Sequence, residues 1–362
     1  MSKDSENGPA LNKESLRLKK TKVGIIGVGY LGRFHLEKYA RMAEVALGGV
    51  AEVRPDRLKE ITDRFQIPGY LDYRDLIPQV EAISIVVPTQ DHGRIARDCL
   101  EAGVPVLIEK PITSTLAEAE ELIALAGRKG CLIQVGHLER FNPAYLKVRH
   151  LIHHPLFIET HRLSPFKERG IDVNVVLDLM IHDLDLILHL TDSPPANVQA
   201  VGVPVVSNQV DIANARIQFQ NGGVANITAS RISIKAMRKL RIFQPGAYLS
   251  LDLGAKAYRL VRLEKGPEKV PPGMPFVFEE GSFSEQDALE LELRSFIRSI
   301  QEGIPPLVSG EDGRKALALA LEVNREIEKN CSPGSASWIP ENLPNLEAFQ
   351  SWLDPETNGF QP

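Results

Sequence analysis

The sequence predicts an α/β protein in which a doubly wound parallel sheet is followed by an α+β domain with a large, mainly antiparallel open sheet. Three observations support this. Short apolar runs alternate with helical runs up to about residue 134, apolar and polar residues alternate after residue 198, and a glycine-rich turn separates the first strand from the first helix. The length of 362 residues and the hydrophobic content of 43% suit a globular protein with a sizeable core.

The first part of the chain is an alternation of predicted strands and helices. Short apolar strands joined by helices form parallel sheets covered on both faces, as in Rossmann-type nucleotide-binding domains. The predicted strands are Val23–Gly27, Val45–Glu52, Ala82–Val87, Val104–Ile108 and Leu132–Val135, and the predicted helices are Leu31–Ala43, Asp56–Phe65, Gly93–Ala102 and Leu116–Lys129.

The second part begins with two helical stretches, Tyr145–His153 and Leu177–Leu190. The alternation that follows is typical of antiparallel strands with one packed face and one open face. Two helices, Ala288–Gln301 and Asp312–Lys329, close this domain. The predicted strands are Val198–Val206, Ile212–Phe219, Val224–Ser230, Lys239–Gln244, Tyr248–Leu253 and Tyr258–Val261.

Four segments follow from this pattern. The start of the chain is polar and lysine-rich without the apolar core of a signal peptide, and its end is rich in Pro, Ser and Asn. We expect a flexible tail over residues 1–20, a dinucleotide-binding domain over 21–142, a second α/β domain over 143–330 and a C-terminal extension over 331–362.

Composition argues against several classes of partner. The net charge of −5 disfavours nucleic acid, and no apolar run is long enough to span a membrane. Three cysteines show neither paired nor metal-ligand spacing, which is typical of a reducing compartment. We therefore expect a cytoplasmic protein without a nucleic-acid or membrane partner.

The turn from Gly27 to Gly32 predicts a dinucleotide site. Gly27 permits the tight turn, Gly29 lets the backbone approach a pyrophosphate, and Gly32 lets the helix pack closely on the strand. Free N–H groups at the helix start bind the anion, and Tyr30 and Leu31 lie in the same turn. The alternative is an ordinary glycine turn without a ligand.

Glu52 ends the second predicted strand, where a carboxylate accepts hydrogen bonds from the adenosine ribose and repels a 2′-phosphate. This favours NAD over NADP. Arg54 and Arg57 lie just beyond and are able to bind a 2′-phosphate, so NADP remains an alternative.

The next strand ends carry further polar groups. Pro88, Thr89 and His92 follow the third strand, and Glu109 and Lys110 follow the fourth. Cofactors lie across the carboxyl ends of such strands, so we expect these residues beside the cofactor. The Lys110 ammonium there is able to stabilise a developing alkoxide. The alternatives are a surface histidine at a helix start and a lysine with its head group in water.

A polar cluster follows the last strand of the first domain. His137, Glu139, Arg140 and Asn142 lie at the domain boundary, where ligand clefts often form. We predict that they bind substrate, with Arg140 and Asn142 suited to sugar hydroxyls or a phosphate. Helix capping alone would explain Asn142, but not the other three residues.

A second group is basic and lies after the strand that ends at Ser230. If part of it faces the cleft, it is able to bind a diphosphate, and Arg231 and Lys235 are predicted to do so. A solvated strand face is an equally good interpretation. The group consists of Arg231, Lys235, Arg238, Lys239 and Arg241.

The helix Leu177–Leu190 is mostly apolar, yet it carries Asp178, His182, Asp185 and His189 at helical spacing. Ionisable groups are seldom buried unless paired or functional, and an Asp one turn from a His is able to orient the imidazole. One alternative is that these four residues form the solvent-exposed face of the helix. A metal site is a weaker alternative, and we predict none.

The order of the glycine turn, Glu109-Lys110-Pro111 and the Asp178/His182 pair resembles the glucose–fructose oxidoreductase/inositol dehydrogenase family over roughly residues 21–330. The resemblance implies a Rossmann domain, a second domain whose open sheet serves oligomerisation, a bound NAD or NADP, and a sugar or polyol substrate. By carry-over, His182 is the general base, Lys110 orients the reacting hydroxyl, and Asp178 positions substrate or imidazole. Pro111 resembles a proline that often follows a cis bond.

Within the family, the sequences around residues 136–144 and 175–188 resemble a branch that oxidises UDP-N-acetylglucosamine at its 3-hydroxyl. The resemblance implies this reaction, in a homodimer or homotetramer. Residues 170–176 depart from the family's glycine-rich stretch and are expected to reshape the pocket. The alternatives are another sugar nucleotide, a free sugar or polyol, or a regulator that binds a dinucleotide without turnover.

Overall fold

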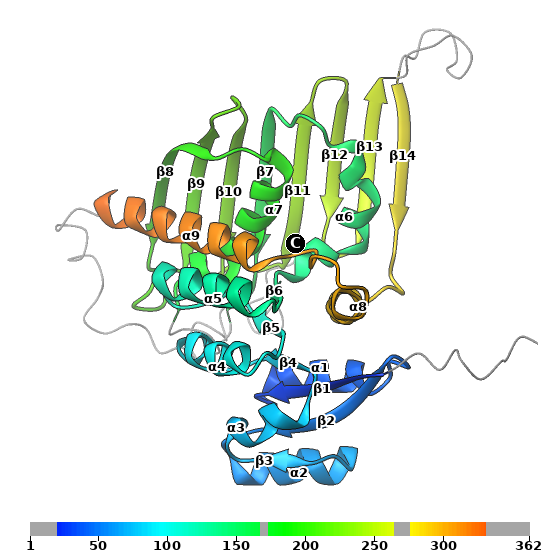
Figure 1. Ribbon diagram of the computed structural model, residues 1–362. Coiled ribbons are helices and arrows are strands. Elements are labelled where there is room, and N and C mark those ends of the chain that lie inside the picture. Colours follow the sequence, from blue (N-terminus) through cyan, green and yellow to red (C-terminus); the bar gives the residue numbers. More distant parts are fainter. Residues whose placement is uncertain (1–19, 167–172, 264–275, 331–362) are drawn as a thin grey trace, which may run out of the picture.

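The computed structural model describes residues 20–166, 173–263 and 276–330. Two sheets organise them, a six-stranded sheet of order β3-β2-β1-β4-β5-β6 and an eight-stranded sheet of order β14-β13-β12-β11-β7-β10-β9-β8 (Figure 1). The predicted fold class is confirmed. Most of the tails predicted at 1–20 and 331–362 lies outside the described residues.

The first sheet is parallel throughout and follows the doubly wound order. Two apolar clusters cover its two faces, which explains why its strands are apolar on both sides. Its strands are β1 (Thr21–Ile26), β2 (Val45–Ala51), β3 (Gly69–Tyr70), β4 (Ala82–Ile85), β5 (Val106–Glu109) and β6 (Ile133–Gly136). Its helices are α1 (Tyr30–Tyr39), α2 (Pro55–Phe65), α3 (Tyr73–Leu76), α4 (Thr89–Glu101) and α5 (Leu116–Lys129).

The second sheet is antiparallel except where β7 pairs with β10 in parallel. The strands β7 and β14 were not expected from the sequence. The strands are β7 (Phe157–Leu163), β8 (Pro195–Val203), β9 (Ile212–Phe219), β10 (Val224–Ser230), β11 (Met237–Gln244), β12 (Ala247–Asp252), β13 (Ala257–Leu263) and β14 (Phe276–Ser282).

Helices cover one face of this sheet, as Figure 1 shows for α6 (Pro143–Val148), α7 (Ile181–Thr191) and α9 (Gly310–Asn330). Buried and exposed residues alternate along β8 and β9, so the other face is open among the described residues. Helix α8 (Ala288–Glu302) follows the second sheet in sequence, yet its apolar side packs with the cluster under the first sheet.

The helix predicted over Leu177–Leu190 is not uniform. It opens with a π-helical turn, Val176–Met180, and continues as α7. π turns insert one residue into the helical repeat and often occur at functional sites.

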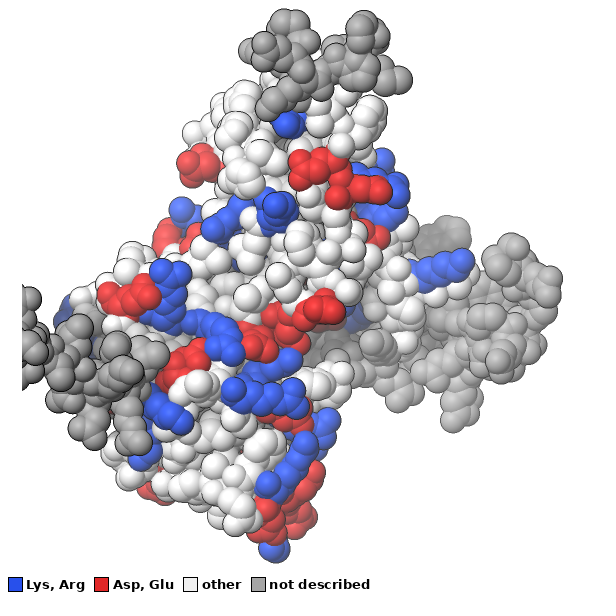
Figure 2. Space-filling model, turned by 90° about the vertical axis from the view of Figure 1, so that its right-hand side faces the viewer, with Lys and Arg blue, Asp and Glu red and all other residues white. Residues whose placement is uncertain are grey.

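No helix among the described residues is long and apolar enough to cross a bilayer. Figure 2 shows basic and acidic side chains side by side on the face it presents, so neither sign forms a continuous patch there.

Candidate active site

The glycine turn has the geometry expected for a dinucleotide site. Gly27 has a φ of +87°, and a Cβ there would lie 2.3 Å from the Val86 carbonyl oxygen. A Cβ on Gly32 would lie 1.9 Å from the Gly27 carbonyl oxygen. A Cβ on Gly29 would meet only Arg57 Nη1, at 3.8 Å. Two glycines therefore allow the backbone to close, and the third leaves open space for a ligand.

A groove of about 700 Å³ runs along this turn. Glu52 is buried in its wall and accepts hydrogen bonds from the Val28 and Arg54 backbone N–H groups, at 3.3 and 3.2 Å. Arg54 Nε lies 3.3 Å from the same carboxylate. Three further polar residues line the groove, Tyr73 at the start of the unexpected helix α3, and Asp91 and Arg94 in α4.

Pro88 lines the groove, and Thr89 begins α4 beside it. His92 is buried, with its ring nitrogens each 2.9 Å from a carbonyl oxygen, Nε2 from Val87 and Nδ1 from Pro111. Burial lowers the pKa of His92. The imidazole therefore links the end of β4 to the loop after β5.

Lys110 leaves β5 at the same edge of the sheet, and the Lys110–Pro111 bond is cis, as the resemblance implied. Its Nζ donates to the Asp178 carbonyl oxygen at 2.6 Å and lies 3.4 Å from Asp178 Oδ1. The structure therefore joins two of the predicted catalytic residues, which are far apart in sequence. Glu109 turns inward, with Oε1 3.1 Å from Nε2 of the buried His35.

His182 follows one turn after Asp178. Burial lowers its pKa well below the ordinary value, and the positive charges of Lys110, Arg162 and Arg238 lower it further. Its Nδ1 is buried and has no hydrogen-bond partner among the described residues. The imidazole is therefore neutral near pH 7 and is able to accept a proton.

His137 lies at the end of β6, and neither ring nitrogen has a hydrogen-bond partner in the described part of the chain. Burial, with the charges of Arg140 and Lys110, lowers the pKa of His137 to about 3. A buried imidazole without partners is unusual, and a bound ligand would satisfy it.

The other members of the predicted cluster have partners inside the protein. Glu139 accepts from Arg162 at 2.8 Å. Asn142 caps α6 and donates to the Leu253 carbonyl oxygen at 2.9 Å. Arg140 lies 3.0 Å from Asp185, and each side chain is only 2% exposed.

The Arg140–Asp185 pair also rules out the alternative that the ionisable residues of this helix form its solvent-exposed face. Asp185 points into the protein, whereas His189 is exposed on the same helix. The four ionisable side chains of this segment do not share one face, because the π turn changes the helical repeat. Asp178 meets Lys110, Asp185 meets Arg140, and His189 faces solvent.

The basic group divides between several environments. Arg231 is buried and donates to Asp211, Val173 and Ser207, so its guanidinium serves this internal network. Lys235 lies on an exposed turn. Arg238 lies 3.8 Å from Glu139, on the side of β11 that faces His182. Lys239 and Arg241 lie on the open face of the sheet, each beside a second groove there.

Sequence reasoning missed Arg162 and Asp183. Arg162 lies on β7 at an inward-facing position and donates two hydrogen bonds to Asp183, both at 2.9 Å. The sequence offered only a weak signal for this, because the inward-facing positions of β7 carry Ile158, Thr160 and Arg162, and only the first of them is apolar. Among the described residues, no three His, Cys, Asp or Glu side chains are placed to bind a metal.

The arrangement offers an ammonium donor and a neutral imidazole close together, at the carboxyl edge of a dinucleotide-binding sheet. Such a pair is able to bind a hydroxyl group and take its proton.

Two family models match the chain. One is described as an oxidoreductase family with an NAD-binding Rossmann fold and matches residues 21–137. The other is described as a GFO/IDH/MocA C-terminal domain and matches residues 147–244.

Known proteins extend this similarity. A UDP-N-acetylglucosamine 3-dehydrogenase from Acidithiobacillus ferrooxidans is 38% identical over 85% of this chain and 97% of its own length. Its solved structure superposes with a TM-score of 0.81, 36% identity and coverage of 86% of this chain and 99% of that chain. A myo-inositol 2-dehydrogenase from Thermotoga maritima is 24% identical over 86% of this chain and 97% of its own length. With both domains matched and the dinucleotide turn in place, the chain belongs to the GFO/IDH/MocA family of oxidoreductases.

Proposed function

We propose that this protein oxidises the 3-hydroxyl of UDP-N-acetylglucosamine to a ketone with NAD⁺. The observation that carries the proposal is the cluster of Lys110, Asp178 and the neutral His182 at the edge of the dinucleotide sheet. The 38% identity to a UDP-N-acetylglucosamine 3-dehydrogenase over nearly the whole of that relative supports the choice of substrate.

The groove along the glycine turn fits the cofactor. Gly29 leaves room for a pyrophosphate, and the N-terminus of α1 provides N–H groups for it. Glu52 lines the same groove, and in this proposal its carboxylate accepts hydrogen bonds from the adenosine ribose. When bound, the nicotinamide supplies the hydride acceptor.

The chain's own residues handle the proton. His182 accepts the hydroxyl proton as the carbon is oxidised, because its lowered pKa keeps the imidazole neutral. The Lys110 ammonium orients the hydroxyl and stabilises negative charge developing on its oxygen. Asp178 holds Lys110 through its carbonyl oxygen and its carboxylate. His137 supplies two further nitrogens for sugar hydroxyls.

A diphosphate partner is supported by the electrostatics of the site. Arg238 lies on the side of β11 that faces His182, and its side chain is 55% exposed. Its guanidinium is therefore available to a phosphate, and Lys235 lies on the turn before it.

The test is oxidation of sugar nucleotides and free sugars by the purified protein. Oxidation to a ketone is unfavourable near neutral pH, so the product is removed by a 3-aminotransferase with glutamate. Mass spectrometry then detects the 3-amino sugar nucleotide, in which an amino group replaces the hydroxyl group. Without the aminotransferase, it detects the ketone as the loss of two hydrogens from the sugar nucleotide. UDP-N-acetylglucosamine should react and free N-acetylglucosamine should not. Faster turnover of inositol or glucose than of any UDP-sugar would instead favour a polyol dehydrogenase, as the Thermotoga relative is named.

NADH should bind more tightly than NADPH, because the buried Glu52 carboxylate repels a 2′-phosphate. Fluorescence titration of each cofactor measures the two dissociation constants. The Glu52→Gln variant should narrow the difference between them. Equal or tighter binding of NADPH by the wild type would reject this role of Glu52.

The pH dependence of kcat/KM should reflect the lowered pKa of His182. A general base works deprotonated, so activity is lost as pH falls through its pKa, and a lowered pKa moves this loss to more acidic pH. We expect the acid limb below the ordinary imidazole value of about 6.5. An acid limb at or above that value would contradict a neutral, desolvated His182.

The protein should be a homodimer or homotetramer that associates through the open face of the second sheet. Val201 and Val203 are exposed on that face of β8, by 54% and 48%. Light scattering at micromolar concentration should give a multiple of the 40.1 kDa chain mass, and Val201→Glu should shift it toward the monomer. A monomer mass for the wild type would count against this assembly.

A further inference from the structure

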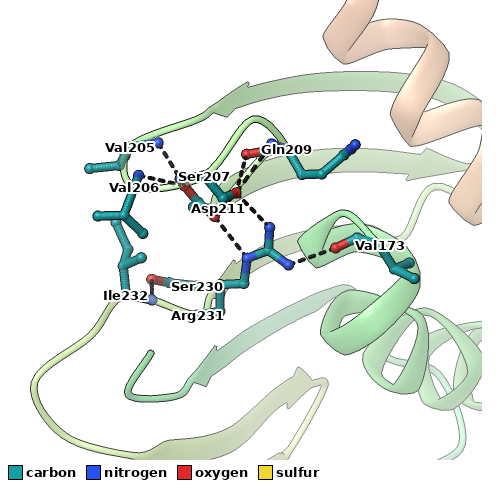
Figure 3. Close-up of polar contacts among 9 residues, drawn as sticks. All are labelled: Val173, Val205, Val206, Ser207, Gln209, Asp211, Ser230, Arg231 and Ile232. Carbon is teal, nitrogen blue, oxygen red and sulfur yellow. Dashed lines mark hydrogen bonds and ion pairs between the residues drawn. The ribbon is translucent and has the colours of Figure 1, made fainter. Parts of the chain in front are cut away.

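We propose that the buried Asp211–Arg231 pair is a positioning device that holds the catalytic segment carrying Asp178 and His182. The activity readout of this inference rests on the proposed function. The pair lies on the loop before β9 and at the end of β10, and both residues are buried (Figure 3).

Asp211 collects an unusual number of donors. Its carboxylate accepts from the backbone N–H groups of Val205, Val206 and Ser207, at 2.7, 2.8 and 3.0 Å. It also accepts from Ser207 Oγ at 2.7 Å and from Arg231 Nε at 2.8 Å. A carboxylate with this many donors is fixed in place, and it fixes the guanidinium that it holds.

Arg231 transfers this fixed position to the catalytic segment. Its Nη1 donates to the Val173 carbonyl oxygen at 2.6 Å, and its Nη2 donates to Ser207 Oγ at 2.9 Å. Figure 3 shows the guanidinium between the Asp211 loop and the backbone at Val173. Val173 lies three residues before Val176, where the π turn that contains Asp178 begins.

The backbone between Val173 and Asp178 is held at two further points. The Val175 N–H donates to the Val210 carbonyl oxygen at 3.0 Å, so the loop that holds Arg231 also contacts this segment. The Asn174 side chain donates to Asn324 Oδ1 of α9 at 3.1 Å. The backbone carbonyl oxygen of Asn174 accepts from the Asp178 N–H at 3.1 Å.

These contacts have a reason in the chemistry. Lys110 Nζ donates to the backbone carbonyl of Asp178, so the position of the lysine depends on the backbone of the π turn. A π turn is a rare helical form that is often found at functional sites, and here the contacts of residues 173–175 lie directly before it. A displacement of reacting groups by about 1 Å lowers the rate of the chemical step by on the order of 10²-fold. The Asp211–Arg231 pair, which we call the brace, holds the backbone that leads into this turn. In this proposal it thereby controls the relative positions of Lys110 and His182.

The experiment compares Arg231→Gln and Asp211→Asn with the wild type in three measurements. We expect kcat to fall by about 10- to 100-fold, while the dissociation constant for NADH stays within about twofold, because the glycine turn lies on the other sheet. Amide hydrogen exchange should rise in residues 173–182 and stay unchanged in β1 and α1. Arg231→Lys keeps the charge but not all three contacts, so its kcat should be intermediate.

The matched control is Ser207→Ala, which removes hydrogen bonds to both Asp211 and Arg231 but leaves the bond to Val173. Its kcat should stay within about threefold of the wild type. A kcat near wild type in Arg231→Gln, or an equal loss in Ser207→Ala, would overturn the inference. If Arg231→Gln does not fold, Arg231→Lys decides by the same measurements. If the wild type turns over no sugar nucleotide, the proposed function fails, and the local exchange in residues 173–182 still decides on the brace.

Discussion

Replacing His182 with alanine should lower kcat by about 10²-fold or more, the scale of general base catalysis. Lys110→Ala should give a loss of similar size, because the reacting oxygen loses its cationic donor. Melting temperatures should stay near that of the wild type, since His182 Nδ1 has no hydrogen-bond partner among the described residues and Lys110 donates to Asp178 within the site itself. Steady-state kinetics, with the product removed by the coupled aminotransferase, measures kcat. Calorimetry measures the melting temperature.

His189→Ala is the matched control for His182. His189 lies on the same helix but is exposed to solvent, with its ring 6.3 Å from that of Tyr145. Its turnover should equal that of the wild type. The pH profile separates the two catalytic roles, because only the His182 variant should lose the acid limb. Near-normal turnover in either catalytic variant would reject the role assigned to that residue.

The parts of the site that the sequence predicted depend on local signals. The glycines of the first turn, Glu52 at the end of β2 and Lys110 at the end of β5 each occupy a position fixed by the element before them. The carboxyl ends of parallel strands lie at one edge of a sheet, so the fold class alone predicts that the glycine turn, Glu52 and Lys110 lie along the same edge.

The parts that were not predicted depend on partners far away in sequence. Arg140 and Asn142 were expected at the ligand, but their partners Asp185, Asp312 and Leu253 come from other elements. No local pattern distinguishes a polar group that binds substrate from one that is paired inside the protein.

The strand β7 shows a further limit. Its seven residues carry only a weak apolar alternation, and it becomes central because β10 and β11 pair on either side of it. The π turn was missed for a similar reason, since the periodicity of an apolar helix assumes a constant repeat.

Replacing Arg162 with methionine should destabilise the protein by about 3–5 kcal/mol, the cost of leaving buried charges unpaired. Arg162 is the shared partner of Asp183, through two hydrogen bonds of 2.9 Å, and of Glu139, through one of 2.8 Å. All three side chains are less than 9% exposed. Urea unfolding monitored by circular dichroism measures the change in the free energy of unfolding.

Arg298→Met is the control for a surface ion pair, because Arg298 and Glu302 are 68% and 49% exposed on α8, and its loss should cost about 0.5 kcal/mol or less. The pH dependence gives a second test. Burial already raises the pKa of Asp183, and without the arginine the folded protein would bind a proton there more readily than the unfolded chain. The folded state then gains stability as pH falls, so the cost of Arg162→Met should be smaller at pH 5 than at pH 7.5. A loss below about 1 kcal/mol at both pH values would show that the carboxylates find other partners, and that the site does not depend on this arginine.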